Sequence, residues 1–187
     1  MANLKIGVVG MAGHMGVLLA REAASTAGCL LVGGTERKGH PAIGRDVGAV
    51  AGLDPIGKAL NEDPAALFRQ ADAVLDFTAP AASALHAELA AKHRKILIVG
   101  TTGLGPAEDK RIAAAARRTV IVRAPNMSPA VNWLMQLTRR TAAAFGEDYD
   151  IEIVEMHHRR KVDAPSGTAL GLGEAAAAGR GRKLADL

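Results

Sequence analysis

The amino-acid sequence predicts an α/β protein with a doubly wound parallel sheet, followed by a second, smaller α/β domain. Three observations indicate this fold. Short apolar runs alternate with helical patterns up to about residue 125. Turns rich in glycine or proline separate these runs. Hydrophobic residues make up 49% of the 187 residues but aromatic residues only 3%, so small aliphatic side chains must fill the core, as they do where helices pack on a parallel sheet.

The first elements have the order strand, turn, helix, strand. Residues 4–9 form an apolar run that ends in glycine, which predicts a buried strand. A glycine-rich turn follows, then a helix over 15–27 that Gly28 ends. A second apolar run at 30–35 predicts the next strand. Together they have the length of one βαβ unit.

The remaining elements continue this alternation. Residues 38–57, which are rich in Gly, Pro and Asp, are expected to be a loop. After residue 126 the pattern changes, which places a boundary between domains 1–126 and 127–187. The other expected helices lie over 63–70, 81–93, 106–118 and 128–145, and an alanine-rich helix runs from the Pro-Ser-Gly-Thr turn to about 178. The other expected strands lie over 73–77, 96–99, 120–123 and 150–156.

Composition narrows the classes of function. A single cysteine, Cys29, excludes a disulfide framework. The N-terminus lacks a basic stretch followed by a long apolar run, and no apolar run reaches about 18 residues, so we expect a cytoplasmic protein with no membrane partner. The formal net charge is +4, but the basic residues are dispersed apart from residues 157–161. A small polyanionic ligand explains this charge, and we expect no nucleic-acid partner.

Residues 10–16 read GMAGHMG, with the second glycine one position later than in the common G-x-G-x-x-G. Glycines let a backbone approach a pyrophosphate closely, and the following helix start offers free N–H groups. Glu36, 20 residues after Gly16, would hydrogen-bond ribose hydroxyls and favours NADH. Arg37 would pair with a 2′-phosphate and favours NADPH. The motif therefore predicts a site for NADH or NADPH, and the alternative for residues 36–38 is a solvated loop.

Further loops follow expected strands. Residues 100–103 and 124–127 each leave a strand end. Ligands of such sheets bind outside the carboxyl ends of the strands, so both loops are placed to meet the nicotinamide half of a dinucleotide. Residues 76–78 end a strand on the same side. Ordinary turn formation is the alternative for all three.

Residues 155–168 read EMHHRRKVDAPSGT and contain the candidate residues for proton transfer and substrate binding. The final turn opens a helix and would offer N–H groups and hydroxyls to a carboxylate, which predicts a small ligand with more than one carboxylate. Histidine exchanges protons near neutral pH, and lysine does so when neighbouring cations and burial lower its pKa, so His157 and Lys161 are candidate proton donors. A metal at His157 and His158 is the competing interpretation. Adjacent histidines on a strand point to opposite faces and no third ligand is evident, so we expect none.

The stretch EMHHRRKVDAPSGTA resembles the signature E-x-H-H-x-x-K-x-D-A-P-S-G-T-A of the 4-hydroxy-tetrahydrodipicolinate reductase family, also called the dihydrodipicolinate reductase family. Shorter stretches resemble that family in order and spacing: VGMAGHMG at the first turn, DFT at 76–78, GTTG at 100–103 and APNMSPAVN at 124–132. The resemblance covers essentially the whole chain.

This resemblance implies a Rossmann domain that binds NADH or NADPH and a smaller α/β domain that binds a dicarboxylate substrate. The implied reaction reduces (2S,4S)-4-hydroxy-2,3,4,5-tetrahydrodipicolinate to 2,3,4,5-tetrahydrodipicolinate, with loss of water, in lysine and diaminopimelate biosynthesis. His157 and Lys161 would transfer protons, and His158, Gly167 and Thr168 would bind substrate. The implied cofactor contacts are Gly10, Met11, Ala12, Gly13, His14, Met15, Glu36, Arg37, Gly100, Thr101, Thr102, Ala124, Pro125, Asn126 and Met127.

Family members continue beyond the residue at which this chain stops. The resemblance therefore implies that the second domain is incomplete and lacks the strands that form the homotetramer interface of the family. We expect apolar surface to be exposed around residues 150–156, and weak or no activity for the chain as given. Two other functions stay open from the residues: another Rossmann oxidoreductase, such as an amino-acid or semialdehyde dehydrogenase, and a non-enzymatic nucleotide-binding protein.

Overall fold

The computed structural model describes residues 3–157, 159 and 164–187. The chain forms two compact units, Met1–Arg123 and Ala124–Leu187. The sequence places a domain boundary after residue 126, slightly beyond this division.

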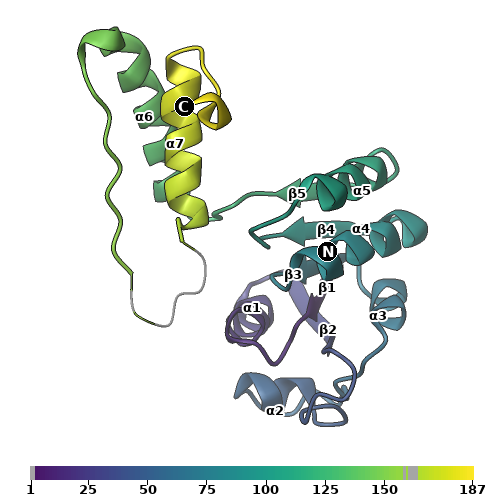
Figure 1. The fold of residues 1–187 in the computed structure, drawn as a ribbon. Helices are drawn as coiled ribbons and strands as arrows, with labels where there is room; N and C mark the ends of the chain where they lie inside the picture. The colour runs from purple at the N-terminus through teal and green to yellow at the C-terminus, as the bar shows by residue number, and fades with distance from the viewer. Residues whose placement is uncertain (1–2, 158, 160–163) are drawn as a thin grey trace. The chain divides into compact units, whose positions relative to one another are not determined.

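The first unit holds a five-stranded parallel sheet in the order β2-β1-β3-β4-β5 (Figure 1). Its strands are β1 Leu4–Val9, β2 Cys29–Thr35, β3 Ala73–Asp76, β4 Ile96–Val99 and β5 Ile121–Arg123. Its helices are α1 His14–Ser25, α2 Val47–Ala51, α3 Pro64–Gln70, α4 Pro80–His93 and α5 Pro106–Ala116. The predicted α/β class with a Rossmann-like sheet is confirmed.

Successive residues of a strand point to opposite faces, so the sheet has a core on each face. Val8 packs with α1 and α2 residues, while Val9 packs with α3, α4 and α5 residues. The helix after β1 therefore covers one face, and the helix after β3 covers the other. Because β1 and β3 are neighbours, their outgoing loops diverge and leave a crevice at the carboxyl ends of the strands.

One segment expected to be loop contains the helix α2. Asp46 is its N-cap and accepts a hydrogen bond from the backbone N–H of Ala49 at 3.1 Å. The same carboxylate accepts from the N–H groups of Ile56 and Lys58, each at 3.1 Å. Burial alone would raise the pKa of Asp46, but these backbone hydrogen bonds outweigh it and hold the pKa below its ordinary value. The prediction of a loop was wrong over Val47–Ala51, where this cap stabilises a helix of only five residues.

The second unit is a pair of packed helices, α6 Pro129–Phe145 and α7 Gly167–Gly179, with short 3₁₀ turns η1 Gly146–Asp148 and η2 Leu184–Asp186 (Figure 1). Ser128 caps α6 and Ser166 caps α7 through their side-chain oxygens. The helices approach closely at Gly179, where an added Cβ would lie 2.3 Å from the carbonyl oxygen of Arg139.

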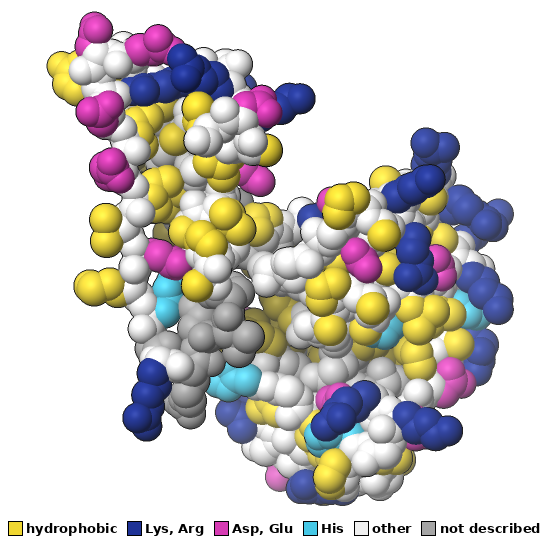
Figure 2. Space-filling view, in the orientation of Figure 1, with side chains coloured by type: hydrophobic (Ala, Val, Ile, Leu, Met, Phe, Trp, Pro, Cys, Tyr) yellow, Lys and Arg dark blue, Asp and Glu magenta, His cyan; other side chains and the backbone are white. Residues whose placement is uncertain are grey.

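The strand expected over residues 150–156 does not form. The segment has no backbone ladder among the described residues, and a strand needs a neighbour to pair its N–H and C=O groups. Its apolar side chains are exposed, with Val154 at 87% and Met156 at 92%, and Trp133 and Leu137 of α6 are also exposed. Hydrophobic side chains are visible along this unit in Figure 2. The expectation of exposed apolar surface is therefore confirmed.

Candidate functional site

The glycine turn between β1 and α1 is shaped for close approach of a ligand. Gly10 has φ +66°, and an added Cβ would lie 2.6 Å from Thr78 Cγ2. A Cβ on Gly16 would lie 2.1 Å from the carbonyl oxygen of Gly10, so the first turn of α1 packs directly against the glycine turn. Gly13 is the N-cap of α1 and provides no side chain to its first N–H groups. Such a turn suits a pyrophosphate.

The other residues expected in this turn have different environments. The side chain of Met11 is fully buried in the core, so its contact with a cofactor would come from the backbone. His14 and Met15 are exposed at the start of α1. Ala12 donates its N–H to Glu36 at 3.1 Å.

Glu36 follows β2 directly, as the sequence predicts, and is tied to the glycine turn. Its Oε2 accepts the Ala12 hydrogen bond, and its Oε1 accepts from the N–H of Arg37 at 2.9 Å. The two oxygens therefore hold the carboxylate beside the turn, where each keeps acceptor capacity for ribose hydroxyls. This geometry fits the dinucleotide that the motif predicts.

A cleft of about 500 Å³ lies at this end of the sheet, within the first unit. It has the size of a small-molecule or cofactor site. Its lining comes from the glycine turn, the end of β2, the loop after β3 and helix α4, and includes Gly10, Gly13, Glu36, Arg37, Thr78 and His86.

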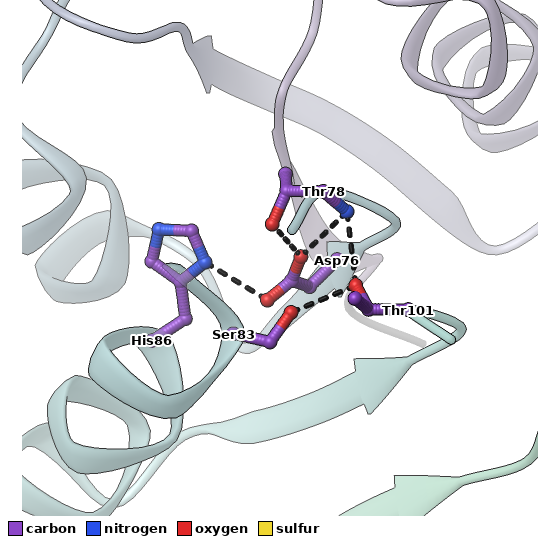
Figure 3. Close-up of polar contacts among 5 residues, drawn as sticks. All are labelled: Asp76, Thr78, Ser83, His86 and Thr101. Carbon is purple, nitrogen blue, oxygen red and sulfur yellow. Dashed lines mark hydrogen bonds and ion pairs between the residues drawn. The ribbon is translucent and has the colours of Figure 1, made fainter. Parts of the chain in front are cut away.

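A buried network stands behind the cleft and joins three chain segments (Figure 3). Asp76, at the end of β3, is fully buried and its Oδ2 lies 2.8 Å from Nδ1 of His86 on α4. Its Oδ1 accepts from the N–H of Thr78 at 3.1 Å and from the Thr78 hydroxyl at 2.6 Å. Buried charges are stable only when paired and hydrogen-bonded, and both oxygens of Asp76 meet this condition.

The network continues into the loop after β4. Thr101 Oγ1 accepts from the N–H of Thr78 at 3.0 Å and lies 2.7 Å from Ser83 Oγ. The hydrogen bond between Thr78 and Thr101 thus joins the loops after β3 and β4, and Ser83 and His86 of α4 attach them to that helix (Figure 3). Gly100 leaves the space for the Phe77 ring, because an added Cβ would lie 2.0 Å from that ring.

The sequence singled out the strand-end residues of this network but missed Ser83 and His86. Their spacing of three residues places both on one face of α4, a face that is otherwise mostly alanine. Polar residues on a buried alanine face are the signal that could have found them.

In the second unit, a residue expected to contact the cofactor lies beside one expected to contact the substrate. Asn126 was expected to contact cofactor and Thr168 to contact substrate. Asn126 Nδ2 donates to Thr168 Oγ1 at 3.2 Å, and Asn126 Oδ1 accepts from the N–H of Ser128 at 2.9 Å. Ala124, Pro125 and Met127 belong to this second unit as well.

The predicted helix start at the Pro-Ser-Gly-Thr turn is confirmed, with Gly167 as the first residue of α7. Ser166 accepts from the N–H of Ala169 at 3.1 Å and donates its own N–H to Glu155 Oε1 at 2.8 Å. His157 Nδ1 lies 2.8 Å from Glu155 Oε2. His158 and Lys161 lie outside the described residues.

No group of three or more His, Cys, Asp or Glu residues is arranged to hold a metal ion in the described ranges 3–157, 159 and 164–187. Within the same ranges, no helix is both long and apolar enough to span a membrane.

Comparison with known proteins shows which family this chain resembles along its length. A family model described as dihydrodipicolinate reductase, N-terminus, matches residues 4–127, and one described as dihydrodipicolinate reductase, C-terminus, matches residues 130–186. The 4-hydroxy-tetrahydrodipicolinate reductase of Dinoroseobacter shibae is 54% identical over 96% of this chain and 67% of its own. The protein of the same name from Brucella abortus is 53% identical over the same shares.

Solved structures agree with these matches. A dipicolinate-bound dihydrodipicolinate reductase from Paenisporosarcina sp. TG-14 is 26% identical, with a TM-score of 0.72 over 95% of this chain and 67% of its own. GenD2 from gentamicin A biosynthesis, solved with NAD, is 19% identical with a TM-score of 0.55 and shares the fold alone.

The sheet, the glycine turn and its acidic partner define an NAD(P)-dependent oxidoreductase of the Rossmann class. The matches over both units make the class specific. The chain belongs to the dihydrodipicolinate reductase family, the NAD(P)H-dependent 4-hydroxy-tetrahydrodipicolinate reductases of lysine biosynthesis. It spans about two thirds of the length of the curated relatives that it matches.

Proposed function

We propose that the first unit binds NADH or NADPH and that the second unit binds (2S,4S)-4-hydroxy-2,3,4,5-tetrahydrodipicolinate, which the chain reduces to 2,3,4,5-tetrahydrodipicolinate with loss of water. The proposal that the first unit binds a dinucleotide rests on the hydrogen bond between Glu36 and Ala12. This bond lies beside a glycine turn that leaves no space for a Cβ at Gly16. The bound nicotinamide would supply a hydride. The residues of the chain bind, orient and move protons.

The pyrophosphate would lie against the glycine turn and the start of α1, and the ribose of the adenosine half against Glu36. Arg37 lines the same cleft and would pair with a 2′-phosphate, which gives NADPH a site as well. We assign the cofactor contacts to Gly10, Met11, Ala12, Gly13, His14, Met15, Glu36, Arg37, Gly100, Thr101, Thr102, Ala124, Pro125, Asn126 and Met127.

A carboxylate of the substrate would bind at the start of α7, where Gly167 and Thr168 form the first turn. His158 would contribute a further substrate contact. His157 and Lys161 would donate and accept the protons that the reduction and the loss of water require. The bond between Asn126 and Thr168 supports this placement, since it links the two sets of expected contacts.

Two properties of the family extend this proposal. We infer that the family assembles as a homotetramer through strands outside residues 1–187, and that the chain acts in the cytoplasm on a small dicarboxylate. Size measurement by analytical ultracentrifugation tests the first inference, and a stable tetramer formed by residues 1–187 would contradict it.

The experiment follows oxidation of NADH and of NADPH with substrate generated in situ by a coupled synthase. The wild-type chain is compared with His157→Gln and Lys161→Ala, and dinucleotide affinity is measured in parallel by fluorescence titration. Each variant is expected to lose at least roughly 100-fold in turnover, the scale of acid–base catalysis, with unchanged dinucleotide affinity.

A matched control is Glu152→Gln, an exposed residue on the same segment, for which wild-type turnover is expected. Near-wild-type turnover in both active-site variants would remove His157 and Lys161 from the mechanism. Dinucleotide binding without any turnover by the wild-type chain would instead favour a nucleotide-binding protein that is not a reductase.

A further inference from the structure

The imidazole of His86 lies between a buried carboxylate and the cleft of the first unit. His86 belongs to α4 and is 7% exposed. Its Nδ1 forms a hydrogen bond of 2.8 Å with Oδ2 of Asp76, and the other ring nitrogen points away from that carboxylate (Figure 3). The same residue lines the cleft. One edge of the ring is therefore used by the fold, while the other is available to a ligand.

The second ring nitrogen, Nε2, stays accessible. Among the residues that the structure describes, none hydrogen-bonds this atom, and it is not one of the fully enclosed polar atoms that lack a partner. Solvent therefore reaches Nε2, and the cleft is the open space that His86 lines. Phe68, which is fully buried, lies with its ring centroid 6.3 Å from that of His86, so the imidazole has a packed neighbour that limits its rotation.

The contacts of Asp76 determine which imidazole nitrogen carries the proton. Oδ1 of Asp76 accepts from the N–H of Thr78 at 3.1 Å and from its hydroxyl at 2.6 Å, so this oxygen carries no proton. Imidazole is more basic than a carboxyl group, so the proton between Oδ2 and the ring resides on His86 Nδ1. In neutral imidazole, Nε2 then has a free lone pair and is a hydrogen-bond acceptor.

The lining of the cleft beside His86 suits a flat, largely apolar ring. Ala82 and His86 are four residues apart on α4 and share one face of that helix. The proposed function places ribose hydroxyls at Glu36, which lines the same cleft. The base joined to that ribose would therefore lie near this face, and adenine offers an exocyclic amino group as a donor. The apolar residues that line the cleft include Pro64, Phe77, Ala82 and Leu85.

We propose that His86 selects the adenine base of the dinucleotide: Nε2 accepts a hydrogen bond from the exocyclic amino group, and Asp76 keeps that nitrogen free of a proton. This inference rests on the proposed function for the identity of the ligand, and adds which group of the base the cleft recognises. Asp76 is the positioning residue of this arrangement, because it is fully buried and acts through His86.

Reduced nicotinamide hypoxanthine dinucleotide tests this assignment, because hypoxanthine carries a carbonyl oxygen where adenine carries the amino group. A carbonyl oxygen only accepts, so it forms no hydrogen bond with an acceptor nitrogen. The full chain is titrated by fluorescence at about pH 8, where an unperturbed histidine is neutral. We expect the affinity for NADH to exceed that for the hypoxanthine dinucleotide on the order of 10-fold.

The substitution His86→Asn removes the acceptor and keeps the bond to Asp76. The asparagine NH₂ takes the place of Nδ1–H as donor, and no atom takes the place of Nε2. The variant is expected to bind the two dinucleotides with affinities within about 2-fold of each other. His93→Asn is the control, since it makes the same substitution at the last residue of α4, outside the lining of the cleft. It is expected to keep the wild-type preference.

The substitution Asp76→Asn makes a prediction that a merely structural role would not. The Thr78 N–H can only donate, so the amide oxygen must face Thr78 and the NH₂ must face His86. Nδ1 then accepts, the proton moves to Nε2, and the nitrogen that faces the cleft becomes a donor. We expect the preference to reverse in favour of the hypoxanthine dinucleotide. A general loss of structure would weaken both dinucleotides alike and leave their ratio unchanged.

The tautomer has a readout that needs no ligand. Long-range ¹H–¹⁵N correlation spectra of the full chain with ¹⁵N-labelled histidine are recorded at the same pH. The His86 signals are identified by their loss in His86→Asn. We expect the Nδ1–H tautomer in wild type and the Nε2–H tautomer in Asp76→Asn.

Equal affinity of the wild-type chain for the two dinucleotides would overturn the proposal while the proposed cofactor site still stands. An unchanged preference in His86→Asn would also overturn it, since another group of the cleft, such as Glu62, would then select the base. An Nε2–H or doubly protonated His86 in wild type would overturn the role of Asp76. If neither dinucleotide binds to the wild-type chain, the proposed function itself fails. If a variant does not fold, the wild-type affinities and tautomer still decide the proposal.

Discussion

The buried carboxylate of Asp76 offers the clearest test of how the fold holds the cofactor loops. Its side chain has no exposed surface, and that of His86 is 9% exposed. The substitution Asp76→Ala removes the acceptor for His86 Nδ1, for the Thr78 hydroxyl and for one of two bonds to the Thr78 N–H. The second of these N–H bonds, to Thr101, is retained.

Two buried groups therefore lose their partner in Asp76→Ala. An unsatisfied buried polar group costs about 1–3 kcal/mol, and His86 can reduce its share by changing tautomer. We expect the free energy of unfolding of the first unit to fall by about 3 kcal/mol. Asp76→Asn can keep both Thr78 bonds and donate to His86, so about 1 kcal/mol is expected for it.

Urea unfolding followed by far-UV circular dichroism measures this loss, because five of the seven α-helices in the described part of the chain lie in the first unit. The single tryptophan, Trp133, and the single tyrosine, Tyr149, both belong to the second unit, so fluorescence serves as an internal reference that should not shift. Asp72→Ala is the control: its carboxylate is 44% exposed beside Lys95, and a loss of at most about 1 kcal/mol is expected.

A loss below about 1 kcal/mol for Asp76→Ala would refute the reasoning, because it would mean that the network contributes no more than an exposed pair. Equal losses for Asp76→Ala and Asp76→Asn would also refute it, since the argument depends on replacing the acceptor oxygens.

Three further outcomes are expected. Gly16→Ala should abolish binding of both dinucleotides in a fluorescence titration, because the new Cβ would lie 2.1 Å from the Gly10 carbonyl oxygen and displace α1 from the glycine turn. Arg37→Ala should weaken NADPH about 10-fold and leave NADH nearly unchanged, through loss of a charge-assisted bond to the 2′-phosphate. Asp46→Asn should flatten the acid dependence of stability: the folded pKa of Asp46 is lowered, so its contribution is present above the unfolded pKa and is lost as the pH falls through the folded pKa.

Each of these has a matched comparison. For Gly16→Ala, a normal circular dichroism spectrum with unchanged NADH affinity would contradict the close packing of turn and helix. NADH is the internal control for Arg37→Ala, and equal weakening of both dinucleotides would contradict a phosphate contact. Asp54→Asn, an exposed carboxylate near α2, is the control for Asp46→Asn. The urea midpoint of each protein is measured at about pH 6 and at about pH 3. If the difference between wild type and Asp46→Asn is the same at both pH values, the assigned hydrogen bonds are contradicted.

The sheet could be predicted from the sequence because the patterns that indicate its strands are local. The apolar run Leu4–Val9 and the glycine turn after it need no distant partner to be recognised, and the strand has the predicted bounds. Helix α2 was missed because its cap, Asp46, is stabilised by N–H groups ten and twelve residues further along the chain. The strand expected over 150–156 was wrong for the opposite reason: its local pattern is favourable, but a strand forms only where a neighbour offers a ladder.

The candidate site shows the same limit. Residues at strand ends, such as Glu36 and Thr101, were identified because strand ends in parallel sheets gather at one edge. The residues that hold them in place, Ser83 and His86, lie inside a helix whose pattern is satisfied without them. A buried carboxylate such as Asp76 cannot stay unpaired, so a helix packed on that strand end must supply a donor. An acidic residue at the end of a buried strand therefore implies a polar residue on the buried face of the next helix. The sequence alone is enough to search for such a pair.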